Sequence, residues 1–363
     1  MKVLYVDIET GGHHQTYLKA LMDIPEKENV LVLPEKIEGL NAKQYVFRKT
    51  DFFNKKLPEY YKWTKEVKGI IKTEKPDVVH FLYGDVFYKY FGLGLEGLKK
   101  KHKVVNTIHA LKKGKVGIVS LKRIMHLSSV GVVHTDAIFN EVKDEGIENV
   151  VHIEYPHFST GYDIDKAGAR KYYGLSENAF VLGCIGGARY DKGLDILLKA
   201  LQSVTGDFEL LVAGAEDAIK REKIEELARP YRDRVKLYLN FLTDEEFEMA
   251  IQAVDAIVLP YRKTFNGASG PLGEGVAKGK MIIAANHGSL GDIVEKNHIG
   301  YTFESENIEA LRKVLNTATV QRNGFTYDEK AYTYKKSLNV TEFQKKYSAI
   351  YKIVGNSNGR EKK

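Results

Sequence analysis

The sequence predicts an α/β protein made of two Rossmann-like domains, and three observations carry this prediction. The chain has 363 residues, which exceeds the size at which a single hydrophobic core usually stops growing. Apolar runs of strand length alternate with helical patterns in two successive series, which is the signature of βαβ units. Several runs are apolar at nearly every position, as expected for parallel strands that helices cover on both faces. We therefore expect two open parallel sheets that face each other across a cleft.

The first series occupies residues 1–160, which we expect to form the amino-terminal domain. Its expected strands are Val3–Val6, Val30–Leu33, Val78–Leu82, Val104–Ile108, Val130–His134 and Val150–Ile153. Its expected helices are Thr16–Met22, Lys62–Thr73, Leu93–Lys100 and Ala137–Asp144. The pattern breaks near residues 155–158, and the polar segment Ser159–Ala169 is expected to mark the domain boundary.

The second series occupies residues 170–340 and predicts the carboxyl-terminal domain. Its expected strands are Phe180–Ile185, Glu209–Ala213, Val235–Leu239, Ala256–Leu259, Met281–Ala285 and Gly300–Phe303. The expected helix Asp195–Leu201 carries an apolar stripe of leucines, which indicates packing and no chemistry. The charged stretch Ile219–Arg229 predicts a solvated helix. A further helix, Thr341–Val354, is expected within residues 341–363, ahead of a polar tail.

Composition narrows the class of protein. Hydrophobic residues make up 43% of the chain, which is ample for packed interiors. The single cysteine, Cys184, excludes a disulfide framework and a Cys-based zinc site, and it fits a reducing compartment. The first residues predict a strand and not a signal peptide, because Asp7 and Glu9 interrupt the apolar run. No stretch approaches the roughly 20 apolar residues that span a bilayer, so we expect a cytoplasmic protein, soluble or peripheral on the membrane.

Basic residues concentrate between positions 86 and 123, within a formal net charge of +7. They are Lys89, Lys99, Lys100, Lys101, Lys103, Lys112, Lys113, Lys115, Lys122 and Arg123, against the single acid Glu96. A solvated face is the simplest interpretation. The aromatic residues at 87, 88, 90 and 91 also suit an anionic membrane or an anionic acceptor. No nucleic-acid recognition motif accompanies the stretch, so nucleic acid is not an expected partner.

A loop and helix start between residues 259 and 288 form the most informative segment. Ser269 is the expected N-cap, Pro271 is tolerated in the first turn, and Glu274 is expected in that first turn. The free N–H groups and the dipole of a helix N-terminus suit a phosphate. A carboxylate there suits the hydroxyl groups of a ribose instead. Taken alone, the segment also fits the Gly-rich turn of any α/β protein.

Other loops at strand ends carry candidate site residues. Gly11 and Gly12 follow the first strand, where paired glycines permit close backbone approach to a ligand, but the pattern GxGxxG of a dinucleotide site is absent. His13 and His14 follow, as acceptor-site candidates or as solvated loop residues. His109 stands just past a strand, at the carboxyl end where α/β sheets bind ligands.

In the second series, Arg189 and Lys192 lie on a Gly-rich loop at a helix start. The Arg fork and the Lys point charge together suit a diphosphate. The alternative is an exposed basic loop. His134, at another strand end, is expected to be structural, since Thr135 also fits the N-cap of the next helix.

The segment Asn266–Glu274, followed by Ala277, Gly279 and Lys280, resembles the donor-nucleotide segment of family 4 retaining glycosyltransferases, a group 1 family with the GT-B architecture. That family carries two glutamates in this segment; Glu274 matches the second, and Asn266 replaces the first. The resemblance implies that the helix in residues 341–363 returns to the first domain. It implies donor-binding roles for Gly12, Asn240, Leu242, Asn266, Gly267, Ala268, Ser269, Gly270 and Glu274.

The resemblance also implies the reaction. Arg189 and Lys192 would hold the donor diphosphate, and His109 would stabilise developing positive charge or position the sugar. The enzyme would be a retaining hexosyltransferase that uses a nucleotide-diphosphate sugar, expected to be a UDP-sugar, with no metal or other cofactor. The acceptor, lipid-linked or anionic, would belong to cell-surface polysaccharide or glycolipid synthesis. Two alternatives stay open: a catalytically silent binding partner of the same fold, which Asn266 favours, and a sugar-nucleotide epimerase.

Overall fold

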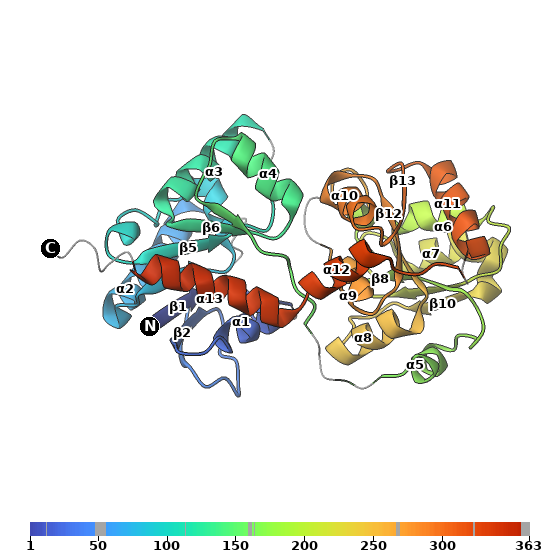
Figure 1. Ribbon diagram of the computed structural model, residues 1–363, viewed down its shortest axis with the longest axis horizontal. Coiled ribbons are helices and arrows are strands. Elements are labelled where there is room, and N and C mark those ends of the chain that lie inside the picture. The colour runs from blue at the N-terminus through green and yellow to red at the C-terminus, as the bar shows by residue number, and fades with distance from the viewer. Residues whose placement is uncertain are drawn as a thin grey trace. The chain divides into compact units, whose positions relative to one another are not determined.

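The computed structural model describes residues 1–11, 13–47, 56–112, 114–158, 162, 164–265, 269–321 and 324–356, without the side chains of residues 13 and 353–356. The chain forms two compact units (Figure 1). Unit 1 comprises Met1–Tyr155 and Val340–Lys363, and unit 2 comprises Pro156–Asn339. The chain therefore passes between the units twice, after Tyr155 and after Asn339.

The described part of unit 1 contains a parallel sheet in the order β3-β2-β1-β4-β5-β6-β7. The strands are β1 (Lys2–Val6), β2 (Glu28–Leu33), β3 (Lys43–Val46), β4 (Val78–Phe81), β5 (Lys103–Thr107), β6 (Val130–Val133) and β7 (Val150–His152). The helices are α1 (His13–Met22), α2 (Leu57–Glu74), α3 (Lys115–Leu127), α4 (Asp136–Asp144) and α13 (Val340–Asn356), with the 3-10 helices η1 (Gly84–Tyr90) and η2 (Leu98–Lys100). The order reverses on either side of β1, as in the Rossmann fold.

The described part of unit 2 repeats this topology in a parallel sheet ordered β10-β9-β8-β11-β12-β13. The strands are β8 (Val181–Ile185), β9 (Glu209–Ala213), β10 (Val235–Tyr238), β11 (Ala256–Leu259), β12 (Met281–Ala285) and β13 (Gly300–Phe303). The helices are α5 (Lys166–Tyr173), α6 (Leu194–Leu201), α7 (Arg221–Ala228), α8 (Asp244–Ala253), α9 (Gly270–Ala277), α10 (Gly288–Lys296), α11 (Ile308–Gln321) and α12 (Glu329–Ser337), with the 3-10 helices η3 (Tyr190–Lys192) and η4 (Arg229–Arg234).

The predicted fold class, two Rossmann-like units with parallel sheets, is confirmed. β11 and β12 are buried at every position, as their apolar sequences predict. The stripe of leucines on α6 lies in the core of unit 2. Among the described residues, no helix combines the length and apolar character needed to cross a membrane.

Helix α13 packs on unit 1 beside α1 and β4 (Figure 1). Its buried face includes Tyr347, Ile350 and Tyr351. The Tyr351 hydroxyl lies 2.8 Å from Nδ1 of His80, a residue buried in β4. The last described helix of the chain therefore completes the interior of its first unit.

The helix predicted at Leu93–Lys100 is wrong. Residues 91–97 form turns between η1 and η2, and only η2 lies within the expected range. Gly92, Gly94 and Gly97 all have positive φ, which an α-helix does not accommodate. The aromatic residues at 87 and 88 belong to η1 and are buried, so they do not form part of an exposed basic-aromatic surface.

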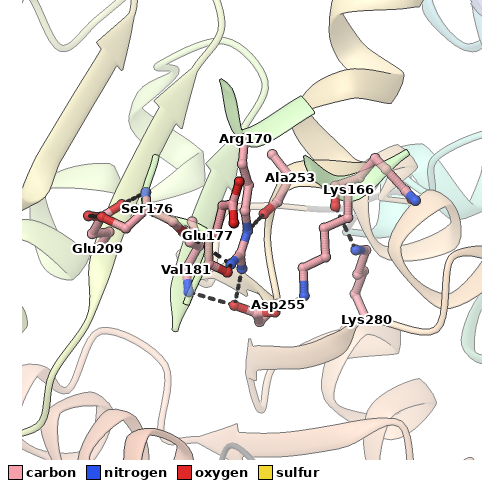
Figure 2. A network of polar contacts seen from close by, with 10 residues as sticks. Lys166, Arg170, Ser176, Glu177, Val181, Glu209, Ala253, Asp255 and Lys280 are labelled. Carbon is pink, nitrogen blue, oxygen red and sulfur yellow. Dashed lines mark hydrogen bonds and ion pairs between the residues drawn. The ribbon is translucent and has the colours of Figure 1, made fainter. Parts of the chain in front are cut away.

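The segment expected as a linker contains α5, which unit 2 holds through the buried side chain of Arg170 (Figure 2). The Arg170 guanidinium donates to the carbonyl oxygen of Ala253 at 3.0 Å and to the Asp255 carboxylate at 2.7 Å. The same carboxylate accepts from the backbone N–H of Val181 at 2.7 Å. This network lies at the amino ends of β8 and β11, opposite the strand ends where ligands bind in such sheets.

Candidate functional site

The start of α9 in unit 2 has the predicted cap. Ser269 is the N-cap, and its side chain accepts from the backbone N–H of Leu272 at 3.4 Å. Pro271 stands in the first turn, where its missing N–H costs nothing. The Tyr261 hydroxyl lies 3.2 Å from the Ser269 hydroxyl and ties the cap to the segment after β11. The predicted donor contacts Asn266, Gly267 and Ala268 lie outside the described residues.

Glu274 lies one turn further along α9 than expected. Since α9 begins at Gly270, Glu274 is its fifth residue and belongs to the second turn, so the first-turn placement is wrong. Its carboxylate contacts Nδ1 of His157, and both side chains are mostly buried, at 15% and 18% exposed. His157 carries no motif, and the sequence analysis did not single it out.

The Gly-rich loop after β8 packs tightly against the end of β11. Gly193 has φ +64°, and a Cβ there would lie 2.0 Å from the carbonyl oxygen of Pro260. A Cβ on Gly186, which has φ +111°, would lie 2.6 Å from Nζ of Lys192. Glycine at these two positions allows the loop to approach β11 and the Lys192 ammonium to lie over the backbone.

Lys192 is the cation in this loop that is open to a ligand. Its Nζ lies 5.9 Å from the centroid of the Tyr261 ring, and no carboxylate of the described residues forms an ion pair with it. Burial, followed by the charge of Arg189, lowers the pKa of Lys192. A poorly hydrated ammonium without a counterion favours the arrival of an anion.

Arg189 differs, because its guanidinium already has a partner. Its Nε donates to the Asp191 carboxylate at 2.9 Å, a second contact joins the same two groups, and the side chain is 51% exposed. The hydrogen bond from Arg189 lowers the pKa of Asp191. A role on a diphosphate would require Arg189 to leave this carboxylate.

Arg262, which the sequence analysis did not single out, holds the loop in place through contacts with residues 190, 191 and 195. Its buried guanidinium donates to both oxygens of Asp195, at 2.9 and 2.8 Å, and lies 4.0 Å from the centroid of the Tyr190 ring. Its backbone N–H donates to the carbonyl oxygen of Asp191 at 2.8 Å. These contacts hold η3, which carries Lys192.

The predicted nucleobase loop follows β10. Asn240 is exposed, and its amide donates to the carbonyl oxygen of Phe241 at 3.3 Å. Leu242 is half-buried against the core, and Thr243 forms a capping box with Glu246 at the start of α8. The Phe241 ring is 80% exposed, which makes it a further candidate for stacking on a base.

In unit 1, His109 stands just after β5 at the carboxyl edge of the sheet. Its Nε2 lies 2.8 Å from the carbonyl oxygen of Leu82, and its ring stacks on Tyr83 with centroids 4.9 Å apart. The buried Asp85 carboxylate accepts from the backbone N–H groups of His109 and Ala110, at 2.9 and 3.0 Å. Backbone and ring contacts therefore hold His109 at its predicted strand end.

The structure brings His14 into the same cluster. Its ring also stacks on Tyr83, with centroids 5.6 Å apart, and its Nδ1 lies 3.0 Å from the Asp7 carboxylate. Burial works to lower the pKa of His14, but the hydrogen bond and charge of Asp7 outweigh it, and the pKa is raised. Gly12 and the side chain of His13 lie outside the described residues.

His134 has a structural environment, as predicted. It is buried, with Nδ1 2.8 Å from the carbonyl oxygen of Ile153 and Nε2 3.1 Å from the Tyr17 hydroxyl. Burial, followed by the charge of His109, lowers the pKa of His134 to about 3, so it is neutral at physiological pH.

An Asp-x-Asp pattern occurs at residues 163–165, and the structure gives its second aspartate another role. Asp165 is the N-cap of α5, and its carboxylate accepts from the backbone N–H of Gly168 at 2.6 Å. Asp163 lies outside the described residues. Among the residues that the structure describes, no group of three or more His, Cys, Asp or Glu side chains has the geometry to hold a metal ion.

Comparison with known sequences identifies the family of unit 2. Residues 165–336 match the family model described as Glycosyl transferases group 1. An uncharacterized glycosyltransferase of Methanocaldococcus jannaschii is 21% identical over 333 residues, which cover 83% of this chain and 79% of that protein. Glycogen synthase of Xanthomonas axonopodis pv. citri is 29% identical over 168 residues, which cover 45% of this chain and 35% of that protein.

Solved structures match nearly the whole chain. Sucrose-phosphate synthase from Thermosynechococcus elongatus matches with a TM-score of 0.79 at 14% identity, over 98% of this chain and 100% of that one. HepE from Anabaena in complex with UDP matches with a TM-score of 0.75 at 16% identity, over 96% and 99%. At these identities the likeness shows the fold, which is GT-B.

Residues 165–336 therefore carry a match to the group 1 glycosyltransferases, and the chain as a whole has the GT-B fold. The resemblance expected from the donor segment is confirmed at this level, and residues 165–336 carry it.

Proposed function

We propose that the protein transfers a hexose from a UDP-sugar to an acceptor in cell-surface polysaccharide or glycolipid synthesis. The observation that carries the proposal is the arrangement around Tyr261 in unit 2. The Lys192 ammonium lies near its ring, and its hydroxyl is hydrogen-bonded to Ser269, the cap of α9. A cation that forms no ion pair with a described residue, and a helix N-terminus beside the same tyrosine, suit a diphosphate. The UDP complex of HepE, a protein of the same fold, supports uridine as the base.

In the proposed mechanism, the diphosphate leaves against donors that are already in place. Lys192 and the free backbone N–H groups at the start of α9, at Ser269 and Gly270, stabilise the negative charge that develops on it. Arg189 adds its fork once it releases Asp191. The reaction then requires no metal and proceeds with retention, by attack on the face from which the diphosphate leaves.

The remaining side chains have proposed binding roles. Glu274 accepts from the ribose hydroxyl groups, and the backbone from Asn240 to Leu242 lines the base. In unit 1, His109 stabilises positive charge or positions the donor sugar and is not the principal base. His14, held by Asp7, contacts the acceptor.

The first test is a screen of thermal stability with UDP, GDP, ADP and NAD. A ligand that binds only the folded state at 100 times its Kd stabilises that state by about 2.7 kcal/mol. We expect UDP to raise the Tm of the wild type by clearly more than that of Lys192→Ala or Glu274→Ala. Lys199→Ala, an exposed lysine on the neighbouring α6, is the matched control and retains the shift. A shift with NAD alone, or with none of the four, refutes the proposal.

The stereochemical outcome has its own assay. Incubation with UDP-glucose and no acceptor, followed by NMR, identifies the anomer that slow hydrolysis releases first. Retention predicts the α anomer, because UDP-glucose has the α configuration. A protein that binds UDP but never releases or transfers sugar fits the silent-partner alternative, and isomerisation of the sugar on UDP fits the epimerase.

We also propose that unit 1 contacts an anionic membrane peripherally through α3. The helix exposes Val116 and Val119, at 71% and 57%, on the face that carries Lys115, Lys122 and Arg123. Apolar side chains flanked by cations on one helix face suit a bilayer with anionic headgroups. This surface replaces the basic-aromatic one that the sequence offered as an alternative to a solvated face, because the residues at 87 and 88 are buried.

A further inference from the structure

His157 contacts both the last residues of unit 2 and the Glu274 side chain of the candidate donor site. It stands two residues after Tyr155, where the chain enters unit 2. Its backbone N–H donates to the carbonyl oxygen of Leu338 at 2.7 Å, and it forms an isolated parallel bridge with Asn339, the last residue of the unit. The entering and leaving segments of unit 2 are therefore hydrogen-bonded to each other at His157.

The side chain of the same residue reaches the candidate donor site. Nδ1 of His157 contacts Oε2 of Glu274, and both side chains are mostly buried. A carboxylate only accepts hydrogen bonds, so His157 donates through Nδ1–H. This contact uses one oxygen of Glu274 and leaves Oε1 with its lone pairs available to a ligand hydroxyl.

Among the described residues, His157 is the hydrogen-bond partner of the Glu274 carboxylate. Glu274 lies in the second turn of α9, away from the backbone N–H groups at the helix start that would hold a first-turn carboxylate. An unheld glutamate loses rotamer entropy when it binds a ligand, and a neighbour that holds it beforehand removes part of that cost. The anchor on Leu338 in turn fixes the backbone from which the imidazole projects.

We propose that His157 is a positioning residue for the donor ribose, which holds the Glu274 carboxylate toward the ligand from the paired segments that begin and end unit 2. This inference rests on the proposed function, because it takes a nucleoside diphosphate as the ligand of Glu274. It extends the donor site to the two chain crossings, so a change at Leu338 or Asn339 acts on donor affinity through His157.

The experiment measures the Kd of UDP and of 2′,3′-dideoxyuridine diphosphate by calorimetry for the wild type, His157→Ala and His157→Asn. We expect His157→Ala to weaken UDP about tenfold, the effect of one hydrogen bond of about 1.4 kcal/mol. The dideoxy compound lacks the hydroxyl groups that Glu274 would bind, so its Kd stays within twofold of the wild-type value. His157→Asn places an N–H donor near the position of Nδ1 and recovers most of the UDP affinity.

Further outcomes separate this inference from simple damage and from the proposed function. Equal weakening of both compounds in His157→Ala indicates structural damage and overturns the inference. Unchanged or tighter UDP binding overturns it too, and tighter binding would mean that His157 competes with the ribose for Glu274. In Glu274→Ala, adding His157→Ala must have no further effect on UDP. A wild type that binds no UDP refutes the proposed function itself.

Discussion

Replacing Lys192 by methionine should change stability and affinity in opposite directions. In the folded protein, burial, followed by the charge of Arg189, lowers the pKa of Lys192. The unfolded chain therefore binds this proton more tightly than the folded one does. The resulting cost to folding is complete below the folded pKa, and it disappears as the pH rises past the ordinary value of 10.5. At pH 7 the ligand-free variant should consequently be more stable than the wild type.

The size of the stability gain is tied to a second measurement. Each unit by which the pKa of Lys192 is depressed corresponds to about 1.4 kcal/mol of stability. The depression measured by NMR titration of the ammonium should therefore match the stability gain measured by urea unfolding.

The affinity for UDP should decrease in the same variant. Loss of a charged hydrogen bond costs about 1.5–3 kcal/mol, or roughly a 10- to 150-fold weaker Kd for UDP. Lys199→Met controls for the loss of one positive charge on an exposed lysine. A variant that is less stable than the wild type at pH 7, or that binds UDP as tightly, refutes this reasoning.

Three further predictions follow from the described structure. Gly193→Ala should lower the free energy of unfolding by more than the roughly 1–2 kcal/mol that a left-handed backbone costs a residue with a side chain, because its Cβ would also lie 2.0 Å from a backbone carbonyl oxygen. Gly187→Ala is the control in urea unfolding, since its Cβ would meet nothing nearer than 3.6 Å. An equal loss of stability in both variants contradicts the packing argument. Sedimentation of the protein with phosphatidylglycerol vesicles should be lost in the double variant Val116→Ser/Val119→Ser. It should be retained in the control Val320→Ser, which changes a valine of unit 2 that is 81% exposed. Equal binding of the wild type to neutral phosphatidylcholine vesicles would exclude the proposed charge dependence. Release of UDP from UDP-glucose should be unchanged by EDTA, and a loss restored by Mg²⁺ or Mn²⁺ would contradict a metal-free reaction.

The sequence predicted most of the fold because the strands are buried on both faces. The bounds of β9, β11, β12 and β13 agree with the expected ranges. β11 and β12 are the plainest cases, because every residue in them is apolar and buried. Ser269 was predictable as a cap because N-capping depends on neighbouring residues alone. The missed α5 had local signals as well: Asp165 as N-cap and Gly174 in the left-handed conformation at the other end.

The candidate site was less predictable because tertiary contacts decide which charged side chains are already paired within the protein and which can bind a ligand. Arg189 and Lys192 look equivalent in the sequence, yet Asp191 neutralises the first and leaves the second without an ion pair among the described residues. Arg262 is as basic as either, but its contacts with Asp195 make it a buried support for the loop. Spacing identified which loops carry the chemistry, and it did not identify which side chain is available.

The position of α13 affects the order in which the protein can mature on the ribosome. Unit 2 is contiguous in the chain, so every residue it needs has been synthesised once Asn339 is made. Unit 1 begins first but lacks Tyr347 and Tyr351, whose hydroxyls end in its buried polar interior, until α13 emerges. Until then, the buried His80 lacks one of its two hydrogen-bond partners. The domain that is translated first is therefore the one completed last.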